Sequence, residues 1–214
     1  MKSNLEDERR EYIRCGLSRT DLDSDPLRQF DLWITAALDA ELTDATAMSL
    51  ATVGSDGQPT LRTVLLKYYD SNGFVFYTNL ESNKARQIGE NPKVALLFYW
   101  REFDRQVKIT GSAGRVATSD SLKYFLTRPR DSQLGAWVSA QSRVIGSRAL
   151  LEQKFEEMKR KFAGGEVPLP SFWGGFRVLP QTIEFWQGRV SRLHDCFIYR
   201  RQADDSWLID RLAP

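Results

Sequence analysis

The sequence predicts an α+β protein that is mostly β, with antiparallel strands and flanking helices. Apolar and polar residues alternate with period two over much of residues 47–116 and 173–211, and turn-forming residues separate the alternating runs. One short helical segment interrupts the first of these regions, while longer segments with helical periodicity lie before residue 40 and between residues 118 and 162. A series of hairpins with one short helical crossover favours a closed antiparallel barrel over a parallel sheet.

The chain is expected to begin with a polar lead segment at residues 1–24, followed by a single domain at residues 25–214. At the start of that domain, Asp25 can cap a helix and Pro26 suits the first helical position. Apolar residues then recur at three- and four-residue intervals up to Leu38. These signals predict an amphipathic helix that buries one face.

Five strands and one short helix are expected next along the chain. The predicted strands are residues 47–53, 60–69, 74–78, 94–100 and 105–116. Ser82 can cap a short helix after the third strand, and Pro92 ends that helix.

The middle of the chain is expected to be helical, and strands return after it. Thr118 can cap a helix that Pro129 ends, a short helix is expected over 131–138, and residues 147–162 form a clear amphipathic pattern. The final predicted strands are residues 173–178, 182–187, 192–200 and 207–211.

The composition excludes several classes of function. The 30 Lys and Arg residues nearly balance the 28 Asp and Glu residues, so the net charge of +2 gives no sign of nucleic-acid binding. Cys15 and Cys196 form no metal-ligand or redox spacing, which favours a reducing compartment. The charged N-terminus lacks the apolar region of a signal peptide, and the longest apolar run, residues 94–100, is too short to span a membrane. We therefore expect a soluble, cytoplasmic protein without a metal, a nucleic-acid partner or a membrane partner.

The only histidine of the chain, His194, lies two residues after Arg192. If residues 192–199 form a strand, the side chains of Arg192, His194 and Cys196 project to one face. With Trp186 just upstream, this face could contact an anionic, planar ligand. A surface histidine, or a histidine satisfied in the core, fits the same stretch. P-loop, dinucleotide-binding, zinc-protease and nucleophile-elbow motifs are all missing from the sequence.

Cations recur beside hydroxyl and amide residues at three further places. Arg62 and Lys67 are five residues apart, so they would point to opposite faces of a regular strand. The other two clusters are Tyr77 and Thr78 with Ser82 and Lys84, and Tyr124 with Arg128 and Ser132. A helix start in the second cluster favours phosphate binding. Each cluster alone also fits a solvated surface, but together they are typical of a protein that binds two phosphorylated, aromatic small molecules.

Several long motifs, in order along nearly the whole chain, resemble the pyridoxamine 5′-phosphate oxidase family. They are Arg-Arg-Glu-Tyr (9–12), Arg-Thr-Val-Leu-Leu-Lys (62–67), Phe-Tyr-Thr-Asn (76–79), Arg-Pro-Arg-Asp-Ser-Gln-Leu-Gly-Ala-Trp-Val-Ser (128–139), Pro-Ser-Phe-Trp-Gly-Gly-Phe (170–176), Glu-Phe-Trp-Gln-Gly (184–188), Arg-Leu-His-Asp (192–195) and Arg-Leu-Ala-Pro (211–214).

The resemblance implies an FMN-binding split β-barrel of the antiparallel Greek-key type, with FMN at the interface of a homodimer. It also implies oxidation of pyridoxamine or pyridoxine 5′-phosphate to pyridoxal 5′-phosphate, with O2 reduced to H2O2. A non-catalytic or weakly active flavin- or pyridoxal-phosphate-binding protein on the same barrel is the alternative.

The resemblance also implies roles for individual residues. The flavin contacts would be Arg62, Thr63, Val64, Leu65, Leu66, Lys67, Tyr77, Thr78, Asn83, Lys84, Gln106, Gln141, Ser142, Trp186 and Cys196. The substrate contacts would be Lys67, Tyr124, Arg128, Ser132, Arg192, Leu193 and His194, with Arg9, Arg10, Glu11 and Tyr12 closing over the site as a lid. Arg192 and His194 are the catalytic candidates, expected to hold the pyridine ring and its 3-oxygen.

Two positions depart from the pattern of the family. Asn83 stands where arginine is usual after the serine, and Cys196 stands where a second arginine usually closes Arg-Leu-His-Asp-Arg. Both expected arginines belong to the flavin set. A hydrogen bond to a charged group contributes about 1.5–3 kcal/mol, so the loss of one could weaken FMN binding roughly tenfold to a hundredfold.

Overall fold

A computed structural model of the chain describes residues 16–214, which divide into two compact units. The first unit combines the chain up to Ser49 with Ala95–Thr110 and Pro180–Pro214; the second combines Leu50–Val94 with Gly111–Leu179. The predicted lid residues Arg9 to Tyr12 lie outside the described part of the chain.

The described residues contain a sheet of nine strands in the order β2-β1-β5-β6-β7-β4-β3, with β8 paired to β7 and β9 to β8. The strands are β1 (Ala47–Val53), β2 (Pro59–Leu65), β3 (Tyr68–Asp70), β4 (Gly73–Asn79), β5 (Lys93–Trp100), β6 (Arg105–Arg115), β7 (Trp173–Gln187), β8 (Asp195–Arg201) and β9 (Trp207–Leu212). The pairs β3–β4, β4–β7, β7–β8 and β8–β9 are antiparallel. The order ends at β2 and β3, so it is an open path, whereas the hairpin pattern predicts a closed barrel. Alternation along a chain predicts strands but not whether the outer two pair.

The structure divides one predicted strand and joins two others. Residues 60–69 are divided by Leu66 and Lys67 into β2 and β3, where the Lys67 N–H donates to the Val75 carbonyl. The strands expected at 173–178 and 182–187 form one strand, β7. Its partner changes from β4, which pairs up to Val178, to β8, which pairs from Thr182. Pro180 lies between these two ladders, so its missing N–H interrupts neither of them.

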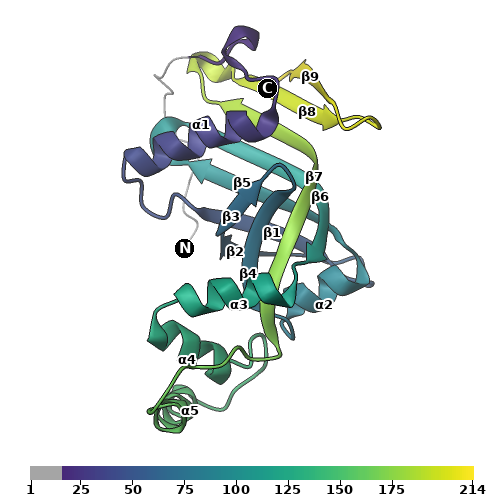
Figure 1. Cartoon of the computed structure of the whole chain (residues 1–214). Helices are drawn as coiled ribbons and strands as arrows, with labels where there is room; N and C mark the ends of the chain where they lie inside the picture. The colour runs from purple at the N-terminus through teal and green to yellow at the C-terminus, as the bar shows by residue number, and fades with distance from the viewer. Residues whose placement is uncertain (1–15) are drawn as a thin grey trace, which may run out of the picture. The chain divides into compact units, whose positions relative to one another are not determined.

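Helix α1 (Pro26–Asp39) provides much of the core of the first unit (Figure 1). The Asp25 carboxylate accepts the Leu27 N–H, which confirms the predicted cap. The ring of Phe30 lies 5.1 Å from that of Phe98, and Trp33 packs edge-on against Phe185 at 5.1 Å. The helix is therefore held by aromatic contacts on its apolar face.

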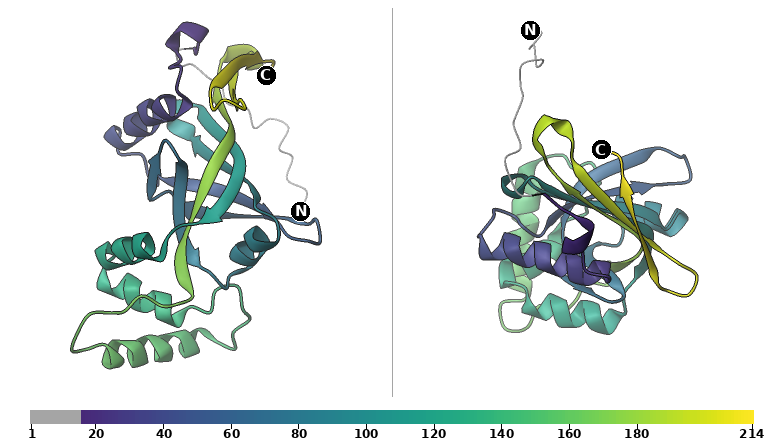
Figure 2. Two further views of the ribbon diagram at one scale, coloured as in Figure 1. Left: turned by 45° about the vertical axis from the view of Figure 1, so that its right-hand side comes forward. Right: turned by 90° about the horizontal axis from the view of Figure 1, so that it is seen from above.

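The loop between β7 and β8 is longer than the sequence predicts. Strand β8 begins at Asp195, not at Arg192, and Val190–Arg192 forms the short 3-10 turn η3. Ser191 and Arg192 have φ values of 56° and 62°, which no strand adopts. The prediction that Arg192, His194 and Cys196 share one strand face is therefore wrong. Figure 2 shows the β8–β9 hairpin, in yellow, beside the end of β7.

Four helices belong to the second unit. They are α2 (Asn83–Glu90), α3 (Thr118–Thr127), α4 (Arg130–Val138) and α5 (Arg148–Lys161). Ser82 caps α2 through its hydroxyl group, as predicted, and Ser147 caps α5 in the same way. Thr118 is the first residue of α3 rather than its cap, because Ala117 is already extended and occupies the N-cap position.

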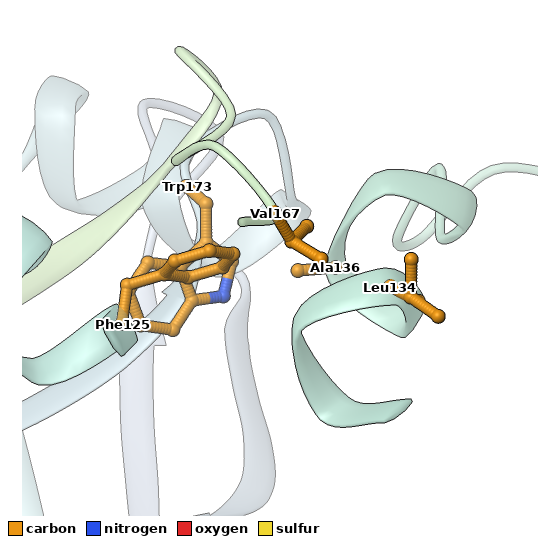
Figure 3. Packing of buried hydrophobic residues seen from close by; sticks show 5 residues of the cluster. All are labelled: Phe125, Leu134, Ala136, Val167 and Trp173. Carbon is orange, nitrogen blue, oxygen red and sulfur yellow. The ribbon is translucent and has the colours of Figure 1, made fainter. Parts of the chain in front are cut away.

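The helical part of the second unit packs around Trp173 at the start of β7. Figure 3 shows the ring of Phe125 against Trp173, at 5.2 Å between ring centroids, with Val167 beside Ala136. Through Phe125, Leu134 and Ala136, this cluster fixes the end of α3 and the second half of α4 against the start of β7. No helix of residues 16–214 is long and apolar enough to cross a membrane.

Candidate functional site

A cavity of about 450 Å³ opens in the second unit, where α2, α3 and α4 meet β2 and β4. Among the described residues, the cations Lys67, Lys84 and Arg128 line it, and no Asp or Glu does. The predicted site residues in its lining are Thr63, Val64, Leu65, Lys67, Tyr77, Thr78, Lys84, Tyr124, Arg128, Ser132 and Gln141. Members of all three clusters thus meet at one cavity, whose positive charge favours anions, although Arg62 and Ser82 do not line it.

Lys84 forms one end of this cavity, in the first turn of α2. Lys84 is only 8% exposed. Among the described residues, its ammonium contacts amide and hydroxyl oxygens and no carboxylate; the closest are Gln141 Oε1 at 2.8 Å and Thr78 Oγ1 at 3.2 Å. Burial, followed by the charge of Arg62, lowers the pKa of Lys84 to about 8. A buried ammonium without a carboxylate is costly, and an anion in the cavity would compensate it.

The N-terminus of α2 is tied to the loop after α4. The Asn83 N–H donates to Ser142 Oγ at 3.3 Å, and Ser142 has a φ of 71°. The neighbouring Gln141 accepts from both Thr78 and Lys84. Gln141 and Ser142 thus bind the Lys84 ammonium and the Asn83 N–H in the first turn of α2. The loop therefore shapes the part of the cavity next to the N-terminus of α2, where the helix dipole favours negative charge.

Arg128 forms the other end, directly after α3. Its guanidinium lies 4.8 Å from the centroid of Trp173, and its Nη1 is buried without a hydrogen-bond partner among the described residues. Burial lowers the pKa of Arg128. Ser132 lies in the first turn of α4, and Tyr124 lies on α3. A planar donor with an unused N–H beside two hydroxyl groups suits a phosphate.

Three stacked rings form the wall of the cavity. Tyr77 stacks on Tyr124 at 4.2 Å and on Trp173 at 5.3 Å. Burial raises the pKa of both tyrosines, so they remain neutral hydroxyl donors at neutral pH. Trp173 was not predicted as a site residue, and neither were Asn79 and Ser139, which also line the cavity.

Gly175 leaves the space that the Tyr77 ring fills. A Cβ at Gly175 would lie 2.8 Å from two ring carbons of Tyr77 and 2.9 Å from a methyl group of Val116. We expect Gly175→Ala to displace this ring and weaken ligand binding in the cavity about tenfold, for a loss of about 1.4 kcal/mol. Gly114→Ala is the matched control, because nothing lies within 4 Å of its Cβ. FMN titration of both variants checks this, and equal affinities would contradict it.

Arg62 lies in the second unit but does not line the cavity. Its guanidinium donates to the Leu50 carbonyl at 3.1 Å, to Thr52 Oγ1 at 2.6 Å and to Thr60 Oγ1. Gln87 Oε1 accepts from both threonines. Arg62 therefore sits in a satisfied polar network, from which its charge still acts on Lys84. The neighbouring predicted contact Leu66 is buried in the core and does not line the cavity.

The remaining predicted residues belong to the first unit, and most of them lie in or next to the loop between β7 and β8. The His194 ring packs on Trp186 at 4.6 Å, and the Arg189 N–H donates to His194 Nδ1 at 3.0 Å. Burial and then the charge of Arg192 lower the pKa of His194. The other predicted residues of this unit are Gln106 on β6, Leu193 in the loop and Cys196 on β8.

Cys196 is buried opposite Trp186 in the β7–β8 register. Burial, and then the charge of Glu184, raise the pKa of its thiol to about 11. Glu184 in turn pairs with Lys108 at 2.5 Å. The position that carries arginine in the family pattern is therefore a neutral thiol here, beside a carboxylate already matched by a lysine.

The cavity with its three cations among the described residues, built on an antiparallel sheet, is typical of a protein that binds phosphorylated small molecules. Residues 34–162 match the family described as pyridoxamine 5′-phosphate oxidase, and residues 173–214 match the pyridoxine 5′-phosphate oxidase C-terminal dimerisation region. The chain therefore belongs to the pyridoxamine 5′-phosphate oxidase family. This confirms the predicted family, and the C-terminal match supports the predicted homodimer.

Relatives agree over nearly the whole chain. A pyridoxine/pyridoxamine 5′-phosphate oxidase of Rippkaea orientalis is 61% identical over 206 residues, which cover 96% of this chain and 97% of the relative. The corresponding protein of Edwardsiella ictaluri is 58% identical, with 99% and 97% covered. Among solved structures, PhzG from Burkholderia lata, in complex with tetrahydrophenazine-1-carboxylic acid, has a TM-score of 0.86 at 30% identity, covering 91% of this chain and 95% of that one. Together with the family match, this likeness confirms the predicted split-barrel fold class.

Proposed function

We propose that this chain is an FMN-dependent oxidase that converts pyridoxamine and pyridoxine 5′-phosphate to pyridoxal 5′-phosphate. The observation that carries the proposal is the set of relatives with that name, 57–61% identical over at least 96% of this chain. They confirm the predicted activity and, with the family, FMN as the cofactor. Bound FMN would supply the two-electron chemistry, and we propose O2 as the oxidant that restores it, forming H2O2.

The cavity carries cations from separate elements, which suits it to anionic groups. We assign the Lys84 end, with Thr78, Gln141 and the α2 N-terminus, to the flavin phosphate, because a buried ammonium without a carboxylate needs an anion. We assign the Arg128 end, with Lys67, Tyr124 and Ser132, to the substrate phosphate, because Arg128 Nη1 is an unused donor beside hydroxyl groups.

We carry the other contacts over from the family resemblance. Trp186, Gln106 and Cys196 would contact the flavin, and Arg192 and His194 would hold the pyridine ring and its 3-oxygen. Arg9, Arg10, Glu11 and Tyr12 would close over the substrate, and FMN would bind at the interface of the homodimer. The role of these residues would be to orient the substrate carbon toward the reactive flavin nitrogen.

Oxygen uptake tests the proposed reaction. Purified protein loaded with FMN should be yellow and should consume O2 when pyridoxamine 5′-phosphate is added. A yellow protein that consumes no O2 would favour the alternative, a flavin-binding protein without oxidase activity. A colourless protein that takes up no FMN would contradict both. We also propose a cytoplasmic location, which suits the free thiol of Cys196; cell fractionation checks it.

The neutral thiol of Cys196 predicts weaker FMN binding than an arginine at this position would give. We expect Cys196→Arg to bind FMN about tenfold to a hundredfold more tightly, through one added charged hydrogen bond. Cys196→Leu is the control, because it fills the buried site without a charge. Equal affinities for the parent protein and Cys196→Arg would refute the expectation of weaker FMN binding.

A further inference from the structure

The hydrogen bond between the Arg189 N–H and His194 Nδ1 defines which ring nitrogen carries the proton. A backbone N–H can only donate, so at 3.0 Å the nitrogen that faces it must offer a lone pair. In neutral imidazole the other nitrogen, Nε2, then holds the hydrogen. The reversed ring would set a C–H against this N–H and leave the donor without its acceptor.

The loop that holds this bond is closed at several points. The Leu193 N–H donates to the Val190 carbonyl at 3.2 Å, and left-handed Ser191 and Arg192 bend the chain between Arg189 and His194. The Trp186 ring covers the imidazole at 4.6 Å. The ring therefore has little freedom to turn over without breaking the loop.

Asp195 anchors the same loop to the rest of the first unit. Its carboxylate accepts the Leu17 N–H at 3.0 Å and Arg211 Nη1 at 2.8 Å, and Arg189 Nε lies 3.8 Å away. Gly16 lies against the end of the Arg189 side chain, which a Cβ at this position would displace. Both residues that flank the loop, Arg189 and Asp195, are thus held together.

We propose that His194 acts as a fixed, neutral Nε2–H hydrogen-bond donor, and that the enzyme therefore selects substrate whose 3-oxygen is deprotonated. A neutral ring whose Nδ1 lone pair is used by the backbone cannot serve as a general base at that atom. Arg192 is also only a donor. Arg192 and the His194 Nε2–H would both donate to the 3-oxygen. An anionic oxygen accepts from both donors, whereas a hydroxyl group would also have to place its own hydrogen beside them. This inference rests on the proposed function, in which Arg192 and His194 contact that oxygen.

The single histidine permits a direct test. Tag-free, FMN-loaded protein labelled with ¹⁵N-histidine contains one imidazole, so its two nitrogen signals need no assignment to a residue. We expect Nε2 to be protonated and Nδ1 unprotonated near neutral pH, with the same tautomer after pyridoxal 5′-phosphate is added. A proton on Nδ1, an averaged signal of two tautomers, or a doubly protonated ring would overturn the proposal.

Two substitutions separate donation from proton abstraction. A glutamine amide can place an N–H near the position of Nε2, whereas leucine cannot. We expect His194→Leu to lower kcat/KM about tenfold to a hundredfold and His194→Gln to lower it less than about tenfold, with FMN content unchanged. Equal losses in the two variants would overturn the donor role. If the parent protein forms no pyridoxal 5′-phosphate, the proposed function fails instead, while the ¹⁵N result still reports the tautomer.

Discussion

Arg128→Met is expected to raise the KM for pyridoxamine 5′-phosphate about tenfold to a hundredfold while changing kcat little. The guanidinium lies on Trp173 with Nη1 unused, and the phosphate that we assign to it is remote from the carbon that is oxidised. A contact of this kind binds the ground state and the transition state alike, so its loss appears in KM. A hydrogen bond to a charged group contributes about 1.5–3 kcal/mol, which gives the expected range.

Arg130→Met is the matched control for Arg128→Met. Arg130 lies two residues further on, but its guanidinium donates to the Gly165 carbonyl at 2.9 Å and to the Phe162 carbonyl, after the end of α5. We expect a small loss of stability and an unchanged KM. Steady-state kinetics with pyridoxamine 5′-phosphate and with unphosphorylated pyridoxamine provide the check. Arg128→Met should lose much of the preference for the phosphorylated amine, and equal KM values for both variants would contradict the assignment.

Lys84→Met is expected to abolish measurable FMN binding and, at the same time, to stabilise the apoprotein. The pKa of Lys84 is lowered from 10.5 to about 8, because burial disfavours the charged form in the folded state. Folding therefore releases a proton between about pH 8 and 10.5, and the stability of the apoprotein rises with pH across that window. At pH 7 the buried charge destabilises the folded apoprotein, and methionine removes this cost.

Urea unfolding of the apoprotein at pH 7 and at pH 9.5, together with FMN titration, tests this expectation. The parent protein should be more stable at the higher pH, and Lys84→Met should lose that difference. Lys93→Met is the control, because Lys93 is an exposed cation at the start of β5. If Lys84→Met destabilised the apoprotein and bound FMN normally, Lys84 would be a structural residue and the flavin phosphate would have to bind elsewhere.

Much of this fold could be predicted because its signals are local. Asp25 and Ser82 are helix caps whose carboxylate and hydroxyl groups act within three residues, and the alternation in β1 follows from burial of one face. Whether the outer strands β2 and β3 pair with each other depends on long-range geometry, so the closed barrel could not be distinguished from the open path.

The residues of the cavity were predicted in part for the same reason. Lys84, Arg128 and Tyr124 stood out as cations and hydroxyl groups near helix ends, but no local pattern shows that these ends meet. Trp173 is not predicted because an apolar residue in a strand indicates core; it is buried, and its ring also packs under the guanidinium of Arg128. Arg62 shows the converse: a cation that looked like a ligand contact is satisfied by Thr52, Thr60 and a backbone carbonyl.

The loop of His194 could not be predicted from periodicity. Left-handed backbone at Ser191 and Arg192 is uncommon for residues other than glycine, and it depends on bonds from Asp195 to Leu17 and Arg211, which are distant in sequence. The composition of residues 192–199 still suits a strand, and β8 occupies most of that range.

A single anaerobic turnover tests whether this protein oxidises pyridoxamine 5′-phosphate with bound FMN. FMN-loaded protein is mixed with pyridoxamine 5′-phosphate in the absence of O2, and the flavin absorbance and the pyridoxal 5′-phosphate formed are measured together. We expect the flavin to become reduced, with one pyridoxal 5′-phosphate formed for each FMN. Arg128→Met should reach the same end point only at higher substrate concentration. Flavin that stays oxidised at saturating substrate would contradict it.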